Sequence, residues 1–248
     1  MISLDNISIY LFSLVASLIA LTVHEYCHGY AAYKLGDPTA RNSGRLSLNP
    51  LHHIDPVGVL FMVIFHFGWA KPVPINPRYF KKPKRDFAIT AIAGPLSNVV
   101  LAFISTPIML LVLLLANRIF TESTGEFAIG LVANLLIFLR YFVVINLGLG
   151  IFNLIPVPPF DGSRIVNVLM PERLYFKIMK YEKYIYWGVI AWLFLGQYVY
   201  FGLMRIPFVA GNQVLSAFAR IFYLSGMISD AINFFYELFV SFWSLIIH

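Results

Sequence analysis

Two histidines that flank a glutamate, in the run His24-Glu25-Tyr26-Cys27-His28, form the segment of this chain best suited to chemistry. In an α-helix, residues four apart are separated by about 40° around the axis, so both imidazoles project from one face and can bind the same metal ion. Glu25 lies one position further round, where it can act as general base on a water molecule without being a ligand. The spacing therefore predicts a hydrolytic metal site.

A catalytic zinc ion needs a third protein ligand and leaves its fourth position for water. Asp161 is the predicted third ligand, because it ends a proline-rich stretch that interrupts an apolar run and places a carboxylate before Gly162. The alternative is an Asp-Gly turn with no role in chemistry. The adjacent His52 and His53 lack the helical spacing, and we interpret them as solvated turn residues.

Apolar composition determines what kind of element must position these side chains. Of the 248 residues, 59% are hydrophobic and 12% are charged, which excludes a soluble globular domain. Apolar runs at about 7–35, 87–116, 127–155 and 184–204 each reach the roughly 20 residues that cross a bilayer. We predict an all-α polytopic membrane protein, with residues 1–248 as a single membrane domain in the lipid bilayer. Residues 207–248 form either one span or two shorter helices.

The segment 41–86 separates the first two long runs and contains six prolines. Proline at this density argues against a helix. Its apolar part, residues 57–69, is too short to be a span by default. We therefore predict a re-entrant insert, extended or β-like in places, that borders a hydrated cavity, because irregular backbone at membrane depth needs polar partners.

The distribution of charge predicts the orientation. The net charge is +6, and the bases gather in connecting segments, a pattern that fits membrane topology and not nucleic-acid binding. A re-entrant insert places all nine bases from Lys34 to Arg85 on the cytoplasmic side, with residues 164–183. The N-terminus then faces outward, and His28 and Asp161 come to the same cytoplasmic half of the membrane.

Several motifs together resemble one known family. They are His24-Glu25-x-x-His28-Gly29, Ala93-Gly94-Pro95-Leu96-Ser97-Asn98, Asn153-x-x-Pro156 and Asp161-Gly162. Through these motifs, the chain resembles the site-2 protease family of intramembrane metalloproteases. The resemblance covers residues of about 20–170. The stretches 44–50 and 68–77 are similar to the family's compact prokaryotic branch, which implies a prokaryotic plasma membrane.

The resemblance implies a three-helix catalytic core at about 7–170, followed by C-terminal membrane helices at about 171–248. It implies one Zn²⁺ bound by His24, His28 and Asp161, and hydrolysis of peptide bonds in or near transmembrane segments of other proteins. By the same resemblance, Asn153 binds the substrate backbone or the developing oxyanion, and Asn98 serves similarly. No attached regulatory domain is expected, which leaves a regulatory membrane partner or a homo-oligomer open.

A transporter is the alternative, because buried ionisable residues also mark metal or proton pathways. Glu25 discriminates between the two functions. A transporter could keep its metal ligands without needing a general base, whereas metal-assisted hydrolysis depends on one.

Overall fold

The computed structural model describes residues 4–65, 68–121, 124–166 and 168–247, and it is predominantly helical. Among the described residues, five helices are long and apolar enough to cross a membrane: α1 (Leu4–Lys34), α4 (Pro83–Ile119), α5 (Glu126–Asn153), α8 (Glu182–Met204) and α11 (Leu224–Ile247). The first four coincide with the predicted apolar runs. The predicted all-α membrane fold is confirmed.

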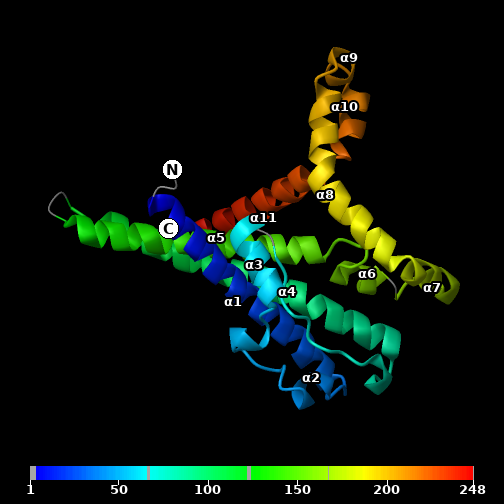
Figure 1. Cartoon of the computed structure of the whole chain (residues 1–248). Coiled ribbons are helices and arrows are strands. Elements are labelled where there is room, and N and C mark those ends of the chain that lie inside the picture. The colour runs from blue at the N-terminus through cyan, green and yellow to red at the C-terminus, as the bar shows by residue number, and fades with distance from the viewer. Residues whose placement is uncertain (1–3, 66–67, 122–123, 167, 248) are drawn as a thin grey trace.

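Helices α1, α4 and α5 form the predicted three-helix core (Figure 1). His24 and His28 of α1 contact Asn98 and Thr90 of α4 respectively, so these two helices run antiparallel. Small residues allow the helices to approach closely: Ala16, Ala20 and Ala102 are completely buried. This close approach brings polar groups of α1 and α4 into direct contact.

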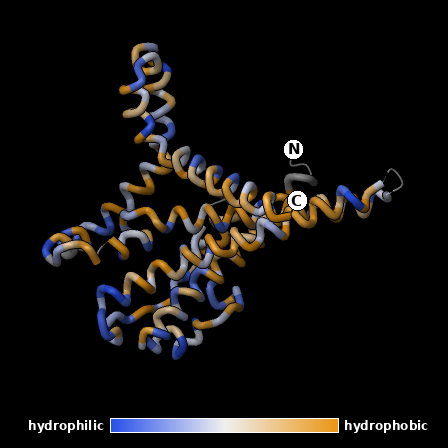
Figure 2. The backbone as a smooth tube through the Cα atoms, turned by 180° about the vertical axis from the view of Figure 1, so that it is seen from behind, coloured by the Kyte–Doolittle hydropathy of each residue, from blue (hydrophilic) through white to orange (hydrophobic). Residues whose placement is uncertain are grey.

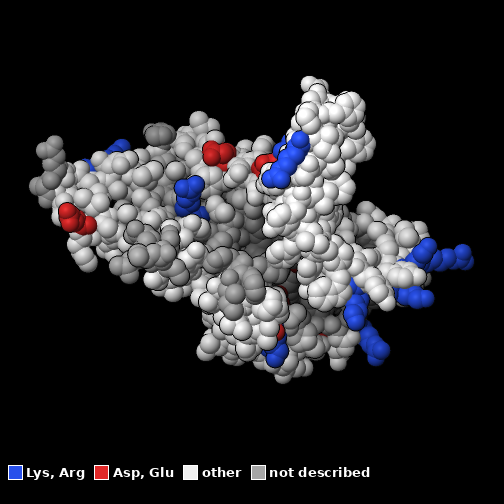
Figure 3. All heavy atoms as spheres, turned by 45° about the horizontal axis from the view of Figure 1, so that its top comes forward, with Lys and Arg blue, Asp and Glu red and all other residues white. Residues whose placement is uncertain are grey.

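The outside of this bundle is apolar, as a bilayer requires. Large hydrophobic side chains such as Leu111, Ile108 and Phe127 are exposed. Figure 2 shows hydrophobic colouring along most of the bundle helices. On the face shown in Figure 3, a few charged side chains are separated by wide uncharged surface. Lipid therefore covers surface that water would cover in a soluble protein.

The insert between α1 and α4 contains two short helices, α2 (Thr39–Asn42) and α3 (Pro56–Phe65), and two 3₁₀ turns, η1 (Pro50–His52) and η2 (Pro77–Tyr79). The expectation that proline excludes helix here was wrong for α3. Pro56 is the first residue of that helix, where a missing N–H costs no hydrogen bond. Among the described residues, the predicted β-like structure is reduced to one antiparallel bridge between Ile54 and Ala70.

After α5 the chain turns into α6 (Asp161–Val166), α7 (Glu172–Lys180) and then α8. The end of α8, with α9 (Pro207–Ala210) and α10 (Gln213–Arg220), forms a helical hairpin that projects from the bundle (Figure 1). The chain then returns to the bundle through α11. The segment that was expected to form either one span or two shorter helices thus forms two short helices and one long one.

Helix α11 runs parallel to α4. Phe239 of α11 contacts Phe103 of α4, and Ser244 and Ile247 lie beside Asn117 and Arg118 near the end of α4. Buried residues from α4, α5 and α11 make one hydrophobic cluster: Ala102, Val143, Leu147 and Phe239. Both chain termini lie toward the same end of the molecule in Figure 1.

Candidate metal centre

The structure brings one carboxylate, that of Asp161, to two imidazoles that lie far earlier in the sequence, those of His24 and His28. The Nε2 atoms of His24 and His28 lie 3.0 Å apart, and each is 3.2 Å from Oδ2 of Asp161. Both histidines are buried, while the Asp161 side chain is 24% exposed. The three ligand atoms therefore form a nearly equilateral triangle, open to solvent from the side of the aspartate.

The chain reaches this triangle by a tight turn after α5. That helix ends at Asn153, and the prolines that follow prevent it from continuing. A Cβ atom on Gly162 would lie only 2.6 Å from the carbonyl oxygen of Ile155, so glycine is needed for the turn to fold back. Arg164 then stacks on Phe87, which holds α6 against the start of α4. Asp161, the first residue of α6, is thereby placed beside α1.

The outer nitrogens of both imidazoles are hydrogen-bonded. Nδ1 of His28 is 2.7 Å from the carbonyl oxygen of Thr90, and Nδ1 of His24 is 2.6 Å from Oδ1 of Asn98. A carbonyl oxygen only accepts, so each Nδ1 carries the proton and donates it. The Nε2 lone pairs of His24 and His28 consequently point at each other and at Asp161.

This arrangement fits a zinc ion. Ligand atoms about 2.0–2.1 Å from a tetrahedral zinc lie about 3.4 Å apart, close to the triangle in the structure. Without a cation, two lone pairs and a carboxylate would repel one another at these distances. A carboxyl group such as that of Asp161 is ionised at neutral pH and supplies the negative charge that a cation requires. The site therefore offers two neutral nitrogens and one anion.

Gly94 provides the space for both imidazoles. A Cβ atom there would overlap the ring of His28 and lie 2.8 Å from Cε1 of His24. The next residue, Pro95, has no N–H to donate to the carbonyl of Ala91. The Gly94-Pro95 pair thus lacks a side chain at one position and a backbone donor at the next, beside the predicted metal ligands.

Glu25 is half-buried next to the triangle and is held by the insert. Its Oε2 accepts a hydrogen bond from the backbone N–H of Val73 at 2.7 Å. The insert backbone is fixed in turn, because Arg45 donates to the carbonyl of Lys71 and Asp37 accepts from the N–H of Asn76. The proline-rich insert therefore orients the predicted general base.

The structure places the two predicted substrate-binding asparagines differently. Asn153, the last residue of α5, is partly exposed, and its side chain donates to the carbonyl of Leu149 in its own helix. Asn98 is completely buried, and its oxygen is bound to His24. A substrate could reach Asn153 but not Asn98.

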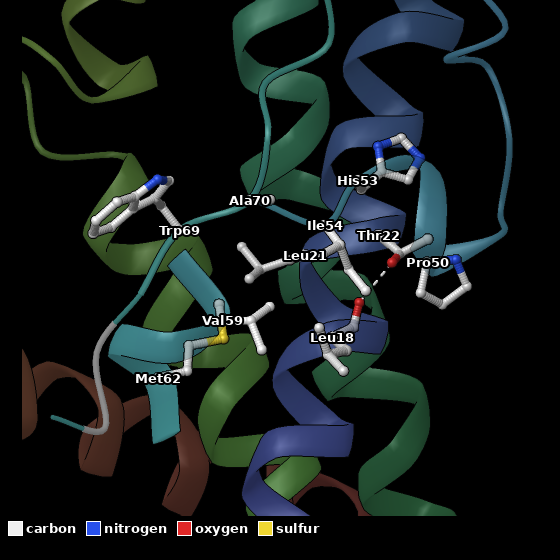
Figure 4. Close-up of a pocket in the computed structure, with 10 residues that line it drawn as sticks. All are labelled: Leu18, Leu21, Thr22, Pro50, His53, Ile54, Val59, Met62, Trp69 and Ala70. Atoms are coloured by element: carbon white, nitrogen blue, oxygen red, sulfur yellow. Dashed lines mark hydrogen bonds between the residues drawn. The ribbon is translucent and has the colours of Figure 1, made fainter. Parts of the chain in front are cut away.

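A small cavity lies between α1 and the insert, about one turn before His24 (Figure 4). Its volume is about 10 Å³, enough for about one water molecule. His53, which borders it, is only 3% exposed, so the interpretation as a solvated turn residue was wrong. Its Nε2 donates to the carbonyl of Ser47. His53 thus contributes to packing of the insert on α1.

Sequence reasoning missed three residues that support the predicted site: Thr90 bonds His28, Val73 of the insert bonds Glu25, and Asn146 bonds Asn98. A signal existed for Asn146, which is a polar residue inside an apolar run. For Val73, the important group is a backbone N–H, and the residue type gives no sign of it.

Comparison with known proteins gave consistent results. Residues 12–196 match the family model described as "Peptidase family M50". The Bacillus subtilis protein named "Putative zinc metalloprotease YwhC" is 39% identical over 213 residues, which are 84% of this chain and 91% of that protein. MJ0611 of Methanocaldococcus jannaschii, described in the same words, is 28% identical over 197 residues, 79% of this chain and 82% of that protein. No solved structure matches the chain significantly.

Proposed function

Because the chain belongs to peptidase family M50 and is an intramembrane zinc metalloprotease, we propose that His24, His28 and Asp161 bind its zinc ion and that Glu25 is the general base. The convergence of three ligand atoms, with both Nδ1 atoms already engaged elsewhere, supports this assignment. The relatives are named as metalloproteases, and none of them supports the transport alternative.

The residues of the site supply the parts of a hydrolytic mechanism. When bound, zinc polarises the scissile carbonyl and makes water a better nucleophile. Glu25, oriented by the N–H of Val73, takes the proton from the attacking water and returns it to the leaving amine. We assign the binding of the substrate backbone or the oxyanion to Asn153, whose amide would turn from its own helix toward the substrate. Asn98, being buried, orients His24 instead.

The substrates are membrane proteins, and a transmembrane helix must unwind before its peptide bonds can be attacked, because its amides are bonded within the helix. We propose a cut in or near a transmembrane segment. The partly exposed Asp161 gives the substrate a side from which to approach. Regulation by a membrane partner or by a second copy of the chain stays a prediction, to be tested by copurification from membranes and by the oligomeric state in detergent.

We further propose that residues 1–248 form one membrane domain with its catalytic core at about 7–170. Its location is proposed to be a prokaryotic plasma membrane, with the N-terminus outside and the active site toward the cytoplasm. The clustering of Lys and Arg between the first two long helices supports this orientation.

The decisive experiment compares the purified wild type with Glu25→Gln and His28→Ala, measuring zinc content and cleavage of single-span membrane proteins. Glu25→Gln should keep one zinc per chain and lose cleavage by about 10²–10⁴-fold, the usual contribution of a general base. His28→Ala should lose both zinc and cleavage. Zinc retained in full by His28→Ala, or cleavage retained by Glu25→Gln, would contradict the assignment.

A further inference from the structure

A chain of buried amides connects helix α5 to the metal ligand His24 through Asn98. We propose that Asn146 of α5 is a positioning residue for zinc binding, acting through Asn98. The inference rests on the proposed function of His24 as a zinc ligand. Asn146 belongs to none of the sequence motifs described above, and it does not touch the zinc triangle itself.

The side-chain amides of Asn98 and Asn146 bond each other and the surrounding helices. Oδ1 of Asn146 accepts from Nδ2 of Asn98 at 2.9 Å, and Nδ2 of Asn146 donates to the carbonyl oxygen of Phe142 at 2.8 Å. Nδ2 of Asn98 also donates to the carbonyl oxygen of Ala20 in α1, at 3.1 Å. Both hydrogens of the Asn98 amide are therefore used, one on α1 and one on α5.

These bonds decide which way each amide faces. The carbonyl oxygens of Phe142 and Ala20 can only accept, so the nitrogen of each asparagine must face them. With its nitrogen held in this way, Asn98 presents its oxygen to His24. That oxygen requires a proton on Nδ1 of His24, which leaves the Nε2 lone pair free for the metal.

Asn146 stabilises this orientation of the Asn98 amide. A flipped Asn98 amide would point its oxygen at two acceptors, the Ala20 carbonyl and Oδ1 of Asn146, and would point its nitrogen at the donor of His24. Without Asn146, only the carbonyl of Ala20 and the Nδ1–H of His24 would oppose the flip. Asn98 and Asn146 are both completely buried, so no bulk water can replace a lost partner.

Close packing of the helices brings the two asparagines within reach. Gly150, one turn beyond Asn146 on the same face of α5, lies directly against α4. A Cβ atom at Gly150 would be 2.9 Å from Cγ2 of Val99 and 3.1 Å from the carbonyl oxygen of Pro95. The contact between α4 and α5 is therefore tight where the amide chain crosses it.

A double-mutant cycle tests whether Asn146 acts through Asn98. The purified full chain is loaded with zinc, and the rate of zinc release to a chelator is measured for wild type, Asn146→Leu, Asn98→Leu and the double variant. Thr106→Val is the matched control, because Thr106 is also completely buried on α4 but bonds only the carbonyl of Ala102 in its own helix. Cleavage activity is measured in parallel.

Asn98→Leu should release zinc about 10–100-fold faster, as is usual for partners of metal-bound histidines. We expect about 5–10-fold for Asn146→Leu alone, less than about 2-fold from adding it to Asn98→Leu, and no change for Thr106→Val. Full additivity in the double variant, or release by Asn146→Leu no faster than by Thr106→Val, would overturn the inference. If Asn146→Leu is not monodisperse, Asn146→Ala is measured instead and judged by the same ratios. Failure of the wild type to bind one zinc per chain would refute the proposed function, a different outcome from an additive cycle.

Discussion

Gly94 lies directly against the two proposed zinc ligands of α1. The rings of His24 and His28 occupy the space that a Cβ atom would need. We expect Gly94→Ala to weaken zinc binding by at least about 10-fold, because both ligands must shift. Gly130→Ala is the control, since a Cβ atom at Gly130 would meet nothing within 4 Å. Competition with a zinc chelator gives the affinities, and equal values for the two variants would show that the imidazoles can move freely.

Val73 contributes a backbone N–H to the site, and this allows a test that leaves the zinc ligands intact. Val73→Pro removes the donor to Glu25, whereas Val73→Ala keeps it and removes only side-chain packing. A hydrogen bond to a charged group contributes about 1.5–3 kcal/mol, so we expect kcat to fall at least about 10-fold in Val73→Pro with zinc content unchanged. Steady-state cleavage kinetics give kcat for both variants, and metal analysis gives their zinc content. A larger loss in Val73→Ala would mean that packing, not the N–H, orients the base.

The sequence indicated the residues that carry the proposed chemistry but not those that hold them. The spacing of His24 and His28 predicts a shared face because helix geometry is local. The contact between His24 and Asn98 joins residues 74 positions apart. Such contacts depend on how two helices are rotated against each other, which a single sequence does not specify. Asn98 was therefore expected at the substrate, although it lies behind His24, a proposed zinc ligand.

Two glycines of helix α5 that are two positions apart, Gly148 and Gly150, lie in different surroundings. At Gly150 a Cβ atom would press on α4, at 3.1 Å from the backbone of Pro95, whereas at Gly148 it would make ordinary contact, 3.4 Å from the flexible end of Ile232. We expect Gly150→Ala to destabilise the protein by about 1–3 kcal/mol and to speed zinc release. Gly148→Ala should be neutral or slightly stabilising, because alanine favours helix. Thermal unfolding in detergent measures both, and equal stability of the two variants would refute close packing at Gly150.

The long helices α1, α4, α5 and α8 were predictable because their apolar runs are uninterrupted. The structure of the insert was less predictable, and the wrong prediction there has a physical reason. Six prolines argued against any helix in the insert, yet α3 forms between Pro56 and Phe65 because its only proline is at the first helical position. The position of a proline within a segment, more than its frequency, decided the local structure.

Helices α8 and α11 are each long enough to cross a membrane, but their packing does not give two full passages along the bundle. Helix α8 begins near α6, where Arg164 pairs with Glu182. The start of α11 lies beside the middle of α8, since Trp192 donates to the carbonyl of Ile221 and the ring of Tyr200 stacks on that of Tyr223. Because α11 then runs parallel to α4, residues 182–247 make one net passage from one end of the bundle to the other.

This arrangement predicts that both chain termini lie on the same side of the membrane. Five separate crossings would place them on opposite sides.

In a Cys27→Ser background, which removes the one native thiol, single cysteines are introduced at Thr124, between α4 and α5, at Lys81, before α4, and after His248. Intact cells are treated with a membrane-impermeant maleimide. We expect labelling at Thr124→Cys and at the appended cysteine, and none at Lys81→Cys until the cells are lysed, because the basic insert is proposed to face the cytoplasm. An appended cysteine protected together with Lys81→Cys would restore five crossings and require α11 to leave its place beside α4. Labelling of Lys81→Cys alone in intact cells would reverse the proposed orientation of the whole molecule.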